Sequence, residues 1–284
     1  MIVHHARGSL DLSRCVVMGV VNRTPDSFFD GGRMDLAETV DHAARLVDEG
    51  AEALDLGAVK AGPGGDVGEA EELARLLPAV ERLADLPVPL SVETARARVA
   101  QRALAAGAAI VNDVTGLSDR GLARVCARAG AAIVLMHHGD QIRGRPRSPA
   151  YEDVVRAVLE RWHDLVALAT RAGVPDDRII VDPGLDFGKN TFHSLELMRR
   201  LPELVSGGPP VLIAASRKDV IGETLDLPPE ERLEGSLALV AAAVAGGARL
   251  IRVHDVRASV RVVHMIEAVA GDRDPAAPVR GLWD

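Results

Sequence analysis

The chain has 284 residues, of which 48% are hydrophobic, and this suits one large domain of the size of an eight-fold α/β barrel. Its formal net charge is −8 and no basic stripe offsets the acidic majority, so neither a nucleic acid nor a membrane is expected as a partner. No apolar run approaches the roughly 20 residues that cross a bilayer. The two cysteines, Cys15 and Cys126, lie in or beside apolar runs, and no hydrophobic leader precedes the first expected strand. Composition therefore predicts a cytoplasmic protein.

Eight short runs rich in valine, isoleucine and leucine are spaced along the chain and predict strands. They barely alternate between apolar and polar residues, which is typical of parallel strands covered on both faces. The runs cover residues 15–21, 53–56, 88–92, 109–112, 132–136, 179–181, 211–214 and 250–253. We therefore expect a parallel sheet.

Stretches with apolar residues at three- and four-residue spacing lie between these runs and predict helices. Among them are residues 36–49, 69–83, 96–106, 151–172, 229–245 and 258–270. Several end in a glycine just before the next strand, as expected of glycine C-caps: Gly50, Gly107, Gly130, Gly173 and Gly247. No Gly-x-Gly-x-x-Gly turn follows the first strand, so the alternation favours a (β/α)8 TIM barrel, one domain over residues 1–284, over a doubly wound sheet.

Scarce residue types gather at one end of this predicted barrel. In such barrels the loops that leave the carboxyl ends of the strands carry the chemistry. All three lysines and all four phenylalanines of the chain fall in or directly after those loops. They are Phe28, Phe29, Lys60, Phe187, Lys189, Phe192 and Lys218.

Polar side chains also follow the strands directly and converge on the same mouth. They are Asn22, Asp26, Asp55, Glu93, Asn112, Asp113, His137, His138, Asp182, Arg217, Arg252, His254 and Asp255. Any one of them alone is explained more simply as a cap or a brace, because Asp and Asn often satisfy helix N-termini. The whole set predicts a binding site.

Three features of this mouth restrict its ligand. Arg217, Lys218, Arg252 and His254 follow the seventh and eighth strands, the usual phosphate-binding corner of these barrels. Strand-end carboxylates and asparagines offer acceptors to a heterocycle with several N–H donors, and the phenylalanines offer faces for stacking. We expect a flat nitrogen heterocycle with an anionic leaving group, and a sugar phosphate is the alternative left open.

Seven motifs, in order along nearly the whole chain, resemble those of the dihydropteroate synthase family. The most specific is Asn22-Arg23-Thr24-Pro25-Asp26-Ser27-Phe28. The others are Ser91-Val92-Glu93-Thr94, Asn112-Asp113-Val114-Thr115-Gly116, Asp182-Pro183-Gly184 through Phe187-Gly188-Lys189, Ser216-Arg217-Lys218 with Ile221-Gly222, Gly235-Ser236-Leu237-Ala238, and Arg252-Val253-His254-Asp255-Val256.

The resemblance implies a homodimeric, Mg²⁺-using transferase of folate biosynthesis. It would condense 6-hydroxymethyl-7,8-dihydropterin diphosphate with p-aminobenzoate and release diphosphate. Asp182 would bind the amino and amide edge of the pterin, Arg252 and His254 the diphosphate, and Asn22 the Mg²⁺. The implied catalytic residues are Asp182, Lys218, Arg252 and Asn22. The implied substrate-binding residues are Asp55, Glu93, Asn112, Asp182, Lys218, Arg217, Arg252, His254, Phe28, Phe187 and Lys60.

Departures from the family pattern concentrate on the side of the second substrate. Where the family usually has Gly-Glu-Ser-Thr-Arg-Pro-Gly, this chain has Ala58-Val59-Lys60-Ala61-Gly62-Pro63-Gly64. Asp219 replaces a serine that the resemblance places near the carboxylate of p-aminobenzoate, which its charge would repel. Milder changes are Glu93 for Asp, Arg23 for a small apolar residue and Ser194 for Asn.

Simpler interpretations of these changes remain open. Lys60 could replace the charge of the lost arginine, and Asp219 could cap the next helix. For the whole chain, the alternatives are a divergent paralogue with weak or no synthase activity or another acceptor, a non-catalytic pterin-binding subunit, and a pterin-dependent methyltransferase. The last is disfavoured because methyl transfer releases no diphosphate, whereas the segments around Arg217 and Arg252 are intact.

Overall fold

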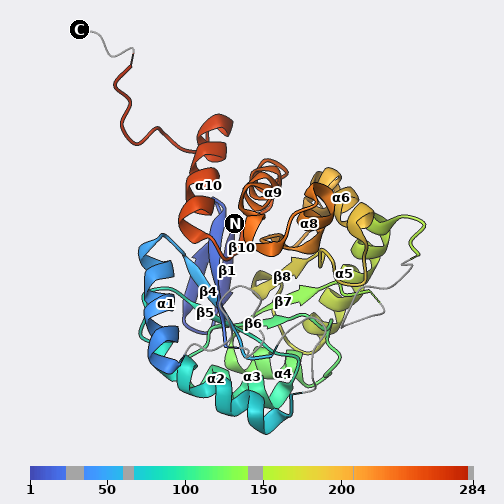
Figure 1. Cartoon of the computed structure of the whole chain (residues 1–284). Helices are drawn as coiled ribbons and strands as arrows, with labels where there is room; N and C mark the ends of the chain where they lie inside the picture. The colour runs from blue at the N-terminus through green and yellow to red at the C-terminus, as the bar shows by residue number, and fades with distance from the viewer. Residues whose placement is uncertain (24–34, 60–66, 140–149, 207, 281–284) are drawn as a thin grey trace.

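The computed structural model describes residues 1–23, 35–59, 67–139, 150–206 and 208–280 (Figure 1). Of the residues expected at the mouth, Asp26, Phe28, Phe29 and Lys60 lie outside this part of the chain. Among the described helices, none is long and apolar enough to cross a membrane.

A parallel sheet in the described part of the chain has eight strands in the order β8-β7-β6-β5-β4-β3-β10-β9. A parallel bridge between Val181 of β8 and Val211, directly before β9, joins the two ends and closes the barrel. The eight strands coincide with the predicted runs to within two residues at each end, which confirms the TIM barrel. Their bounds are β3 (Val16–Asn22), β4 (Ala53–Gly57), β5 (Leu90–Glu93), β6 (Ile110–Asp113), β7 (Ala132–Met136), β8 (Ile179–Asp182), β9 (Leu212–Ile213) and β10 (Leu250–Val253).

Helices surround these strands (Figure 1). Their bounds are α1 (Leu36–Asp48), α2 (Glu69–Leu83), α3 (Ala97–Ala105), α4 (Leu122–Ala129), α5 (Val154–Arg171), α6 (Thr191–Arg199), α7 (Leu201–Val205), α8 (Asp219–Leu225), α9 (Leu233–Ala245) and α10 (Val256–Ala270). The predicted glycine C-caps are confirmed by backbone geometry. For example, Gly50, Gly107 and Gly173 follow α1, α3 and α5 with φ of 103°, 118° and 100°, values that an L residue rarely adopts.

Two predicted helices begin later than expected, for local reasons. The stretch 151–172 becomes helical only at Val154, because Asp153 Oδ1 accepts hydrogen bonds from the backbone N–H groups of Val155 and Arg156 and so caps the helix. The stretch 229–245 begins as a 3₁₀ turn over Pro229–Glu231, and α9 starts at Leu233.

A hairpin that the sequence analysis did not predict precedes the barrel. Strands β1 (Ile2–His5) and β2 (Gly8–Asp11) pair antiparallel. Their buried residues Val3 and Leu10, with Leu12, join the cluster that fills the barrel interior and includes Met18. The hairpin therefore covers the amino end of the barrel, away from the loops that carry the chemistry.

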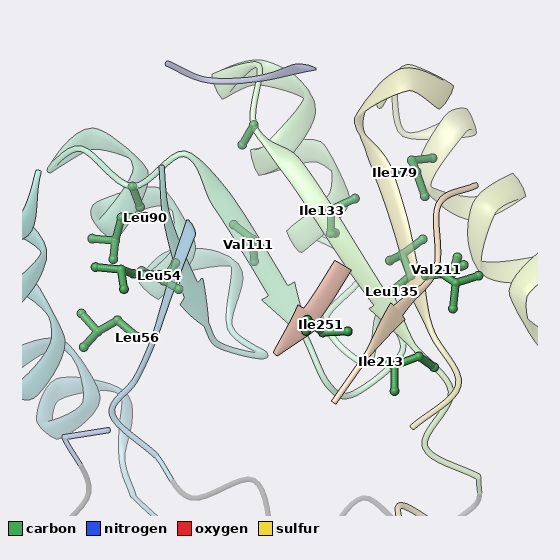
Figure 2. Packing of buried hydrophobic residues seen from close by; sticks show 14 of the residues in the cluster. Leu54, Leu56, Leu90, Val111, Ile133, Leu135, Ile179, Val211, Ile213 and Ile251 are labelled. Atoms are coloured by element: carbon green, nitrogen blue, oxygen red, sulfur yellow. The ribbon is translucent and has the colours of Figure 1, made fainter. Parts of the chain in front are cut away.

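Each strand presents one face to the helices and the other to the barrel interior. Leu54, Leu90, Val111 and Ile133 belong to the cluster between sheet and helices (Figure 2). Alternate residues such as Ala53 and Ile110 belong to the interior cluster, as the two-residue period of a strand requires. This alternation decides which strand-end residues point into the mouth.

Candidate active site at the carboxyl end of the barrel

The inward-facing series of several strands changes from apolar to polar at the carboxyl end. Two residues after Ala53 comes Asp55, and the same step leads from Ile110 to Asn112, from Ile180 to Asp182 and from Leu250 to Arg252. Glu93 ends β5, where it is registered between Gly57 on β4 and Asn112 on β6. Period-two geometry thus brings these predicted site residues to one layer at the top of the interior.

Arg252 lies at the centre of an ion-pair network in this layer. Its Nε donates to Asp55 Oδ2 at 2.6 Å and its Nη2 donates to Glu93 Oε2 at 3.0 Å. Asn112 Nδ2 also donates to Asp55 Oδ2, at 3.0 Å. The other oxygen, Asp55 Oδ1, is buried and has no hydrogen-bond partner in the described part of the chain. A buried acceptor of this kind suits a ligand N–H.

Burial raises the pKa of two acids of this layer. It raises the pKa of Glu93 to about 7, although the charge of Arg252 opposes this change. It also raises the pKa of Asp182, opposed mainly by Lys218. A carboxyl group with a pKa near neutrality can donate or accept a hydrogen bond within one site.

The loop after β8 brings Asp182, Phe187 and Lys218 together. Lys218 Nζ donates to the carbonyl of Leu185 at 2.8 Å and lies 4.9 Å from the centre of the Phe187 ring. Asp182 Oδ1 accepts from the backbone N–H of Gly184 at 2.6 Å. Burial lowers the pKa of Lys218. The mouth therefore offers an aromatic face beside a cation and a carboxylate.

In the expected phosphate corner, Arg217 is held in an ion pair, whereas His254 is a buried imidazole. Arg217 forms a bidentate pair with Asp255, at 2.9 Å for both N–O contacts, and its Nη1 donates to the carbonyl of Pro229. His254 Nδ1 lies 3.1 Å from Ser216 Oγ, and burial lowers the pKa of His254 to about 4. The imidazole is therefore neutral at pH 7, and the guanidinium of Arg217 braces β10 against the loop after β9.

Asp219 is the first residue of α8. Its Oδ1 accepts from Arg232 Nη1 at 2.9 Å, and its side chain is 59% exposed. The N-cap of this helix is Lys218, whose own side chain forms no capping hydrogen bond. Asp186 Oδ2 accepts instead from the backbone N–H of Val220, the second residue of the helix, at 3.1 Å. Asp219 is therefore partly neutralised by Arg232.

Asn22, the expected Mg²⁺ ligand, ends β3 beside Gly57. A Cβ added at Gly57 would lie 3.7 Å from Asn22 Oδ1. In the described ranges no group of three His, Cys, Asp or Glu side chains is arranged to hold a metal. One amide oxygen fits Mg²⁺ only if phosphate oxygens and waters supply most of its ligands, which is how Mg²⁺ usually binds nucleotide-like substrates.

A buried carboxylate that the sequence did not predict lies near Glu93. Glu72 on α2 accepts from Thr94 Oγ1 at 2.5 Å and pairs with Arg96, which in turn donates to the carbonyl of Val67 at 2.7 Å. Thr94 lies in a quoted motif, but helical periodicity alone could not distinguish Glu72 from its exposed acidic neighbours. The network fixes the turn that presents Glu93.

The fold and this charged mouth define an α/β-barrel enzyme whose site lies at the carboxyl ends of the strands. A family model described as pterin binding enzyme matches residues 18–254. Among relatives, the chain is 45% identical over 277 residues to inactive dihydropteroate synthase 2 of Mycobacterium tuberculosis (strain ATCC 25618 / H37Rv), covering 95% of this chain and 87% of that one. It is 41% identical over 274 residues to dihydropteroate synthase of Bacillus subtilis (strain 168), covering 94% and 93%.

A solved structure gives the same result. The Yersinia pestis dihydropteroate synthase, crystallised as a sulfonamide drug complex, matches with a TM-score of 0.92 at 37% identity, covering 96% of this chain and all of that chain. The chain belongs to the pterin-binding enzyme family, and within it is a dihydropteroate synthase-like transferase.

Proposed function

We propose that this protein condenses 6-hydroxymethyl-7,8-dihydropterin diphosphate with p-aminobenzoate and releases diphosphate. The observation that carries the proposal is the layer of the buried Asp55, Asn112 and Asp182 with the partly buried Arg252, in which Asp55 Oδ1 has no partner in the described part of the chain. Its oxygens match the ring and amino N–H groups of a pterin.

The pterin would lie between this layer and the loop after β8. Asp182 would accept from the amino and amide edge, and Asn112 with Asp55 would complete the polar contacts. Phe187, beside Lys218 Nζ, would offer one ring face. This arrangement fixes the plane of the ring and the direction of its methylene group.

The diphosphate would lie toward Arg252 and His254. A Mg²⁺ ion carried with the diphosphate would be held by Asn22 Oδ1 and would neutralise part of the leaving-group charge. Arg252 can donate to phosphate from guanidinium N–H groups that are not directed at Asp55 or Glu93.

In the proposed reaction the C–O bond between the pterin methylene and the diphosphate breaks, and the electron pair leaves with the diphosphate. The amine nitrogen of p-aminobenzoate then bonds to the methylene carbon and loses a proton to solvent or to the diphosphate. The protein's residues position the reactants and stabilise charge, and no strong base is required.

A second candidate is a pterin-binding copy that forms little or no product. Two observations favour it: the relative that is 45% identical is named inactive dihydropteroate synthase 2, and the carboxylate of Asp219 is 59% exposed beside Lys218, where it would repel an acidic acceptor.

One assay separates these two functions. The protein is incubated with the pterin diphosphate and Mg²⁺, with and without p-aminobenzoate, and both diphosphate and dihydropteroate are quantified. Product that depends on p-aminobenzoate supports the synthase, whereas tight pterin binding in calorimetry without product supports the second candidate. Absence of pterin binding would contradict both.

We also infer a cytoplasmic location and a homodimer. The first is supported by two buried free cysteines, Cys15 and Cys126. The second follows from the family resemblance and is tested by sedimentation equilibrium, in which a mass of one chain would contradict it.

A further inference from the structure

Lys189 is the largest fully buried side chain of the described structure, with 0% relative exposure. It lies in the loop between β8 and α6, and among the described residues its hydrogen bonds go to no side chain of the proposed pterin layer. Complete burial of an ammonium is costly unless its donors are satisfied. Its location therefore requires a structural or functional reason, and the reaction proposed above does not use it.

Four acceptors surround Lys189 Nζ in the described part of the chain. They are the carbonyls of Phe187, Gly184 and His137 at 2.9, 3.0 and 3.1 Å, and His137 Nδ1 at 2.8 Å. Burial, and next the charge of Lys189, lower the pKa of His137 to about 3, so this imidazole is neutral and its Nδ1 can accept. Lys189 therefore links the end of β7 to two points of the loop after β8.

The loop itself packs directly on the backbone that Lys189 holds. A Cβ added at Gly184 would lie 2.0 Å from the carbonyl oxygen of His137, and one at Gly188 would lie 2.4 Å from that of His138. Both glycines also have positive φ, 64° and 60°. The loop has no room to move toward β7, and the bonds from Lys189 oppose movement away from it.

The same loop carries groups of the pterin site. Asp182 precedes Gly184, and Phe187 lies beneath Lys218 Nζ, which holds the carbonyl of Leu185 from the other side. Trp162 Nε1 donates to the carbonyl of Asp182 at 3.1 Å. Lys189 holds the carbonyl of Gly184, whose N–H donates to Asp182 Oδ1, and the carbonyl of Phe187. Releasing the Lys189 bonds would therefore disturb both Asp182 and Phe187.

We propose that Lys189 is a positioning residue that holds the loop after β8 so that Asp182 and Phe187 meet the heterocycle. This role rests on the proposed function only for the identity of that heterocycle. The hydrogen bonds from Lys189 to the loop do not depend on a ligand.

The test uses the full chain with Lys189→Met, an unbranched side chain that fills similar volume without donors. Hydrogen exchange of residues 183–190, whose amides at Gly184, Asp186 and Phe187 are hydrogen-bonded, is measured without ligand. We expect exchange there to accelerate about tenfold or more, without an equal change elsewhere. The Kd for 6-hydroxymethyl-7,8-dihydropterin should rise by about tenfold or more, with an unchanged KM for the aromatic amine.

Arg178→Met is the matched control. Arg178 also donates from a basic side chain to a backbone carbonyl, that of Gly130, but it lies at the amino end of β8. It should leave exchange of residues 183–190 and the pterin Kd as in the wild type. If Lys189→Met does not fold, Tyr151→Phe removes a different bond to this loop, at the carbonyl of Gly188, and should give smaller changes of the same sign.

The outcomes are distinguishable. The role of Lys189 is overturned if hydrogen exchange in residues 183–190 is the same in Lys189→Met as in the wild type. It is also overturned if the wild type binds pterin and Lys189→Met binds it with the same Kd. A wild type that binds no pterin overturns the proposed function instead, and the exchange measurement alone then decides whether Lys189 holds the loop.

Discussion

Arg252 contacts two buried carboxylates at once, and this decides what its removal would do. Asp55 and Glu93 are 0% and 9% exposed, and Arg252 is their ion-pair partner among the described residues, so without the guanidinium both would be buried beside each other with no ion pair there. The network is therefore a local balance of charge as well as part of the proposed binding site. Substitutions within it should be strongly non-additive.

We expect Arg252→Met to lower the free energy of unfolding by about 3–5 kcal/mol, the usual cost of breaking a buried ion pair from one side. The triple variant Asp55→Asn, Glu93→Gln, Arg252→Met should recover most of this loss. Urea denaturation at pH 7.5 measures both. If the free energy of unfolding of Arg252→Met lies within about 1 kcal/mol of the wild-type value, the network is solvated.

Glu93 should make stability depend on pH. Its pKa is raised from 4.5 to about 7 by burial, so the folded state holds a proton that the unfolded state has lost between these values. Binding of this proton therefore favours the folded state. Its contribution to stability is fully present below about pH 4.5 and is lost as the pH rises through 7. Relative to wild type, Glu93→Gln should remove this dependence, seen as a difference in unfolding free energy that changes between pH 5 and 8. A constant difference would contradict the assignment.

At the scale of elements, the first turn of α8 places a carboxylate directly after Lys218, a residue of the proposed site. Asp219 is paired with Arg232 and 59% exposed, so its repulsion of a ligand carboxylate is screened and smaller than for an isolated charge. Lys60, which follows β4, lies outside the described residues, and its role stays a prediction from the sequence.

We expect Asp219→Ser to lower the KM for p-aminobenzoate by up to about fivefold, corresponding to at most about 1 kcal/mol. The effect should shrink at high salt. The uncharged analogue 4-aminobenzamide is the control and should show no change. An equal change in KM for the two amines on Asp219→Ser would mean that Asp219 does not face the acceptor's carboxylate.

At the scale of the whole molecule, stability and chemistry lie at opposite ends of the barrel. The hairpin β1-β2 and Leu12 close the amino end, and the charged layer occupies the carboxyl end. This separation is a general property of the fold. It predicts that damage to the hairpin end changes stability and leaves the site's affinity intact.

Leu12→Ala tests this separation, because Leu12 is fully buried in the interior cluster. We expect a loss of about 2–5 kcal/mol in unfolding free energy with an unchanged pterin Kd in calorimetry of the folded protein. Ile2→Ala, at a residue that is 52% exposed, should change the free energy of unfolding by no more than about 0.5 kcal/mol and should leave the pterin Kd unchanged. A weakened Kd in Leu12→Ala would mean that the two ends are coupled.

The sequence by itself determined the barrel, its eight strands and the set of polar residues at its mouth. It could do so because buried parallel strands and amphipathic helices have local periods, and because inward positions on a strand follow from counting by two. The hairpin β1-β2 was not predicted, because strands of four residues have too few positions to show a period.

Only the tertiary structure decided which partners these residues have. It pairs Arg217 with Asp255, Asp219 with Arg232 and Arg252 with two carboxylates, and it buries Lys189 among carbonyls. The physical reason is that burial and ion pairing depend on atoms contributed by segments far apart in the chain. Local pattern places a residue on a face, but the packing of that face sets its charge, its partners and its freedom to bind a ligand.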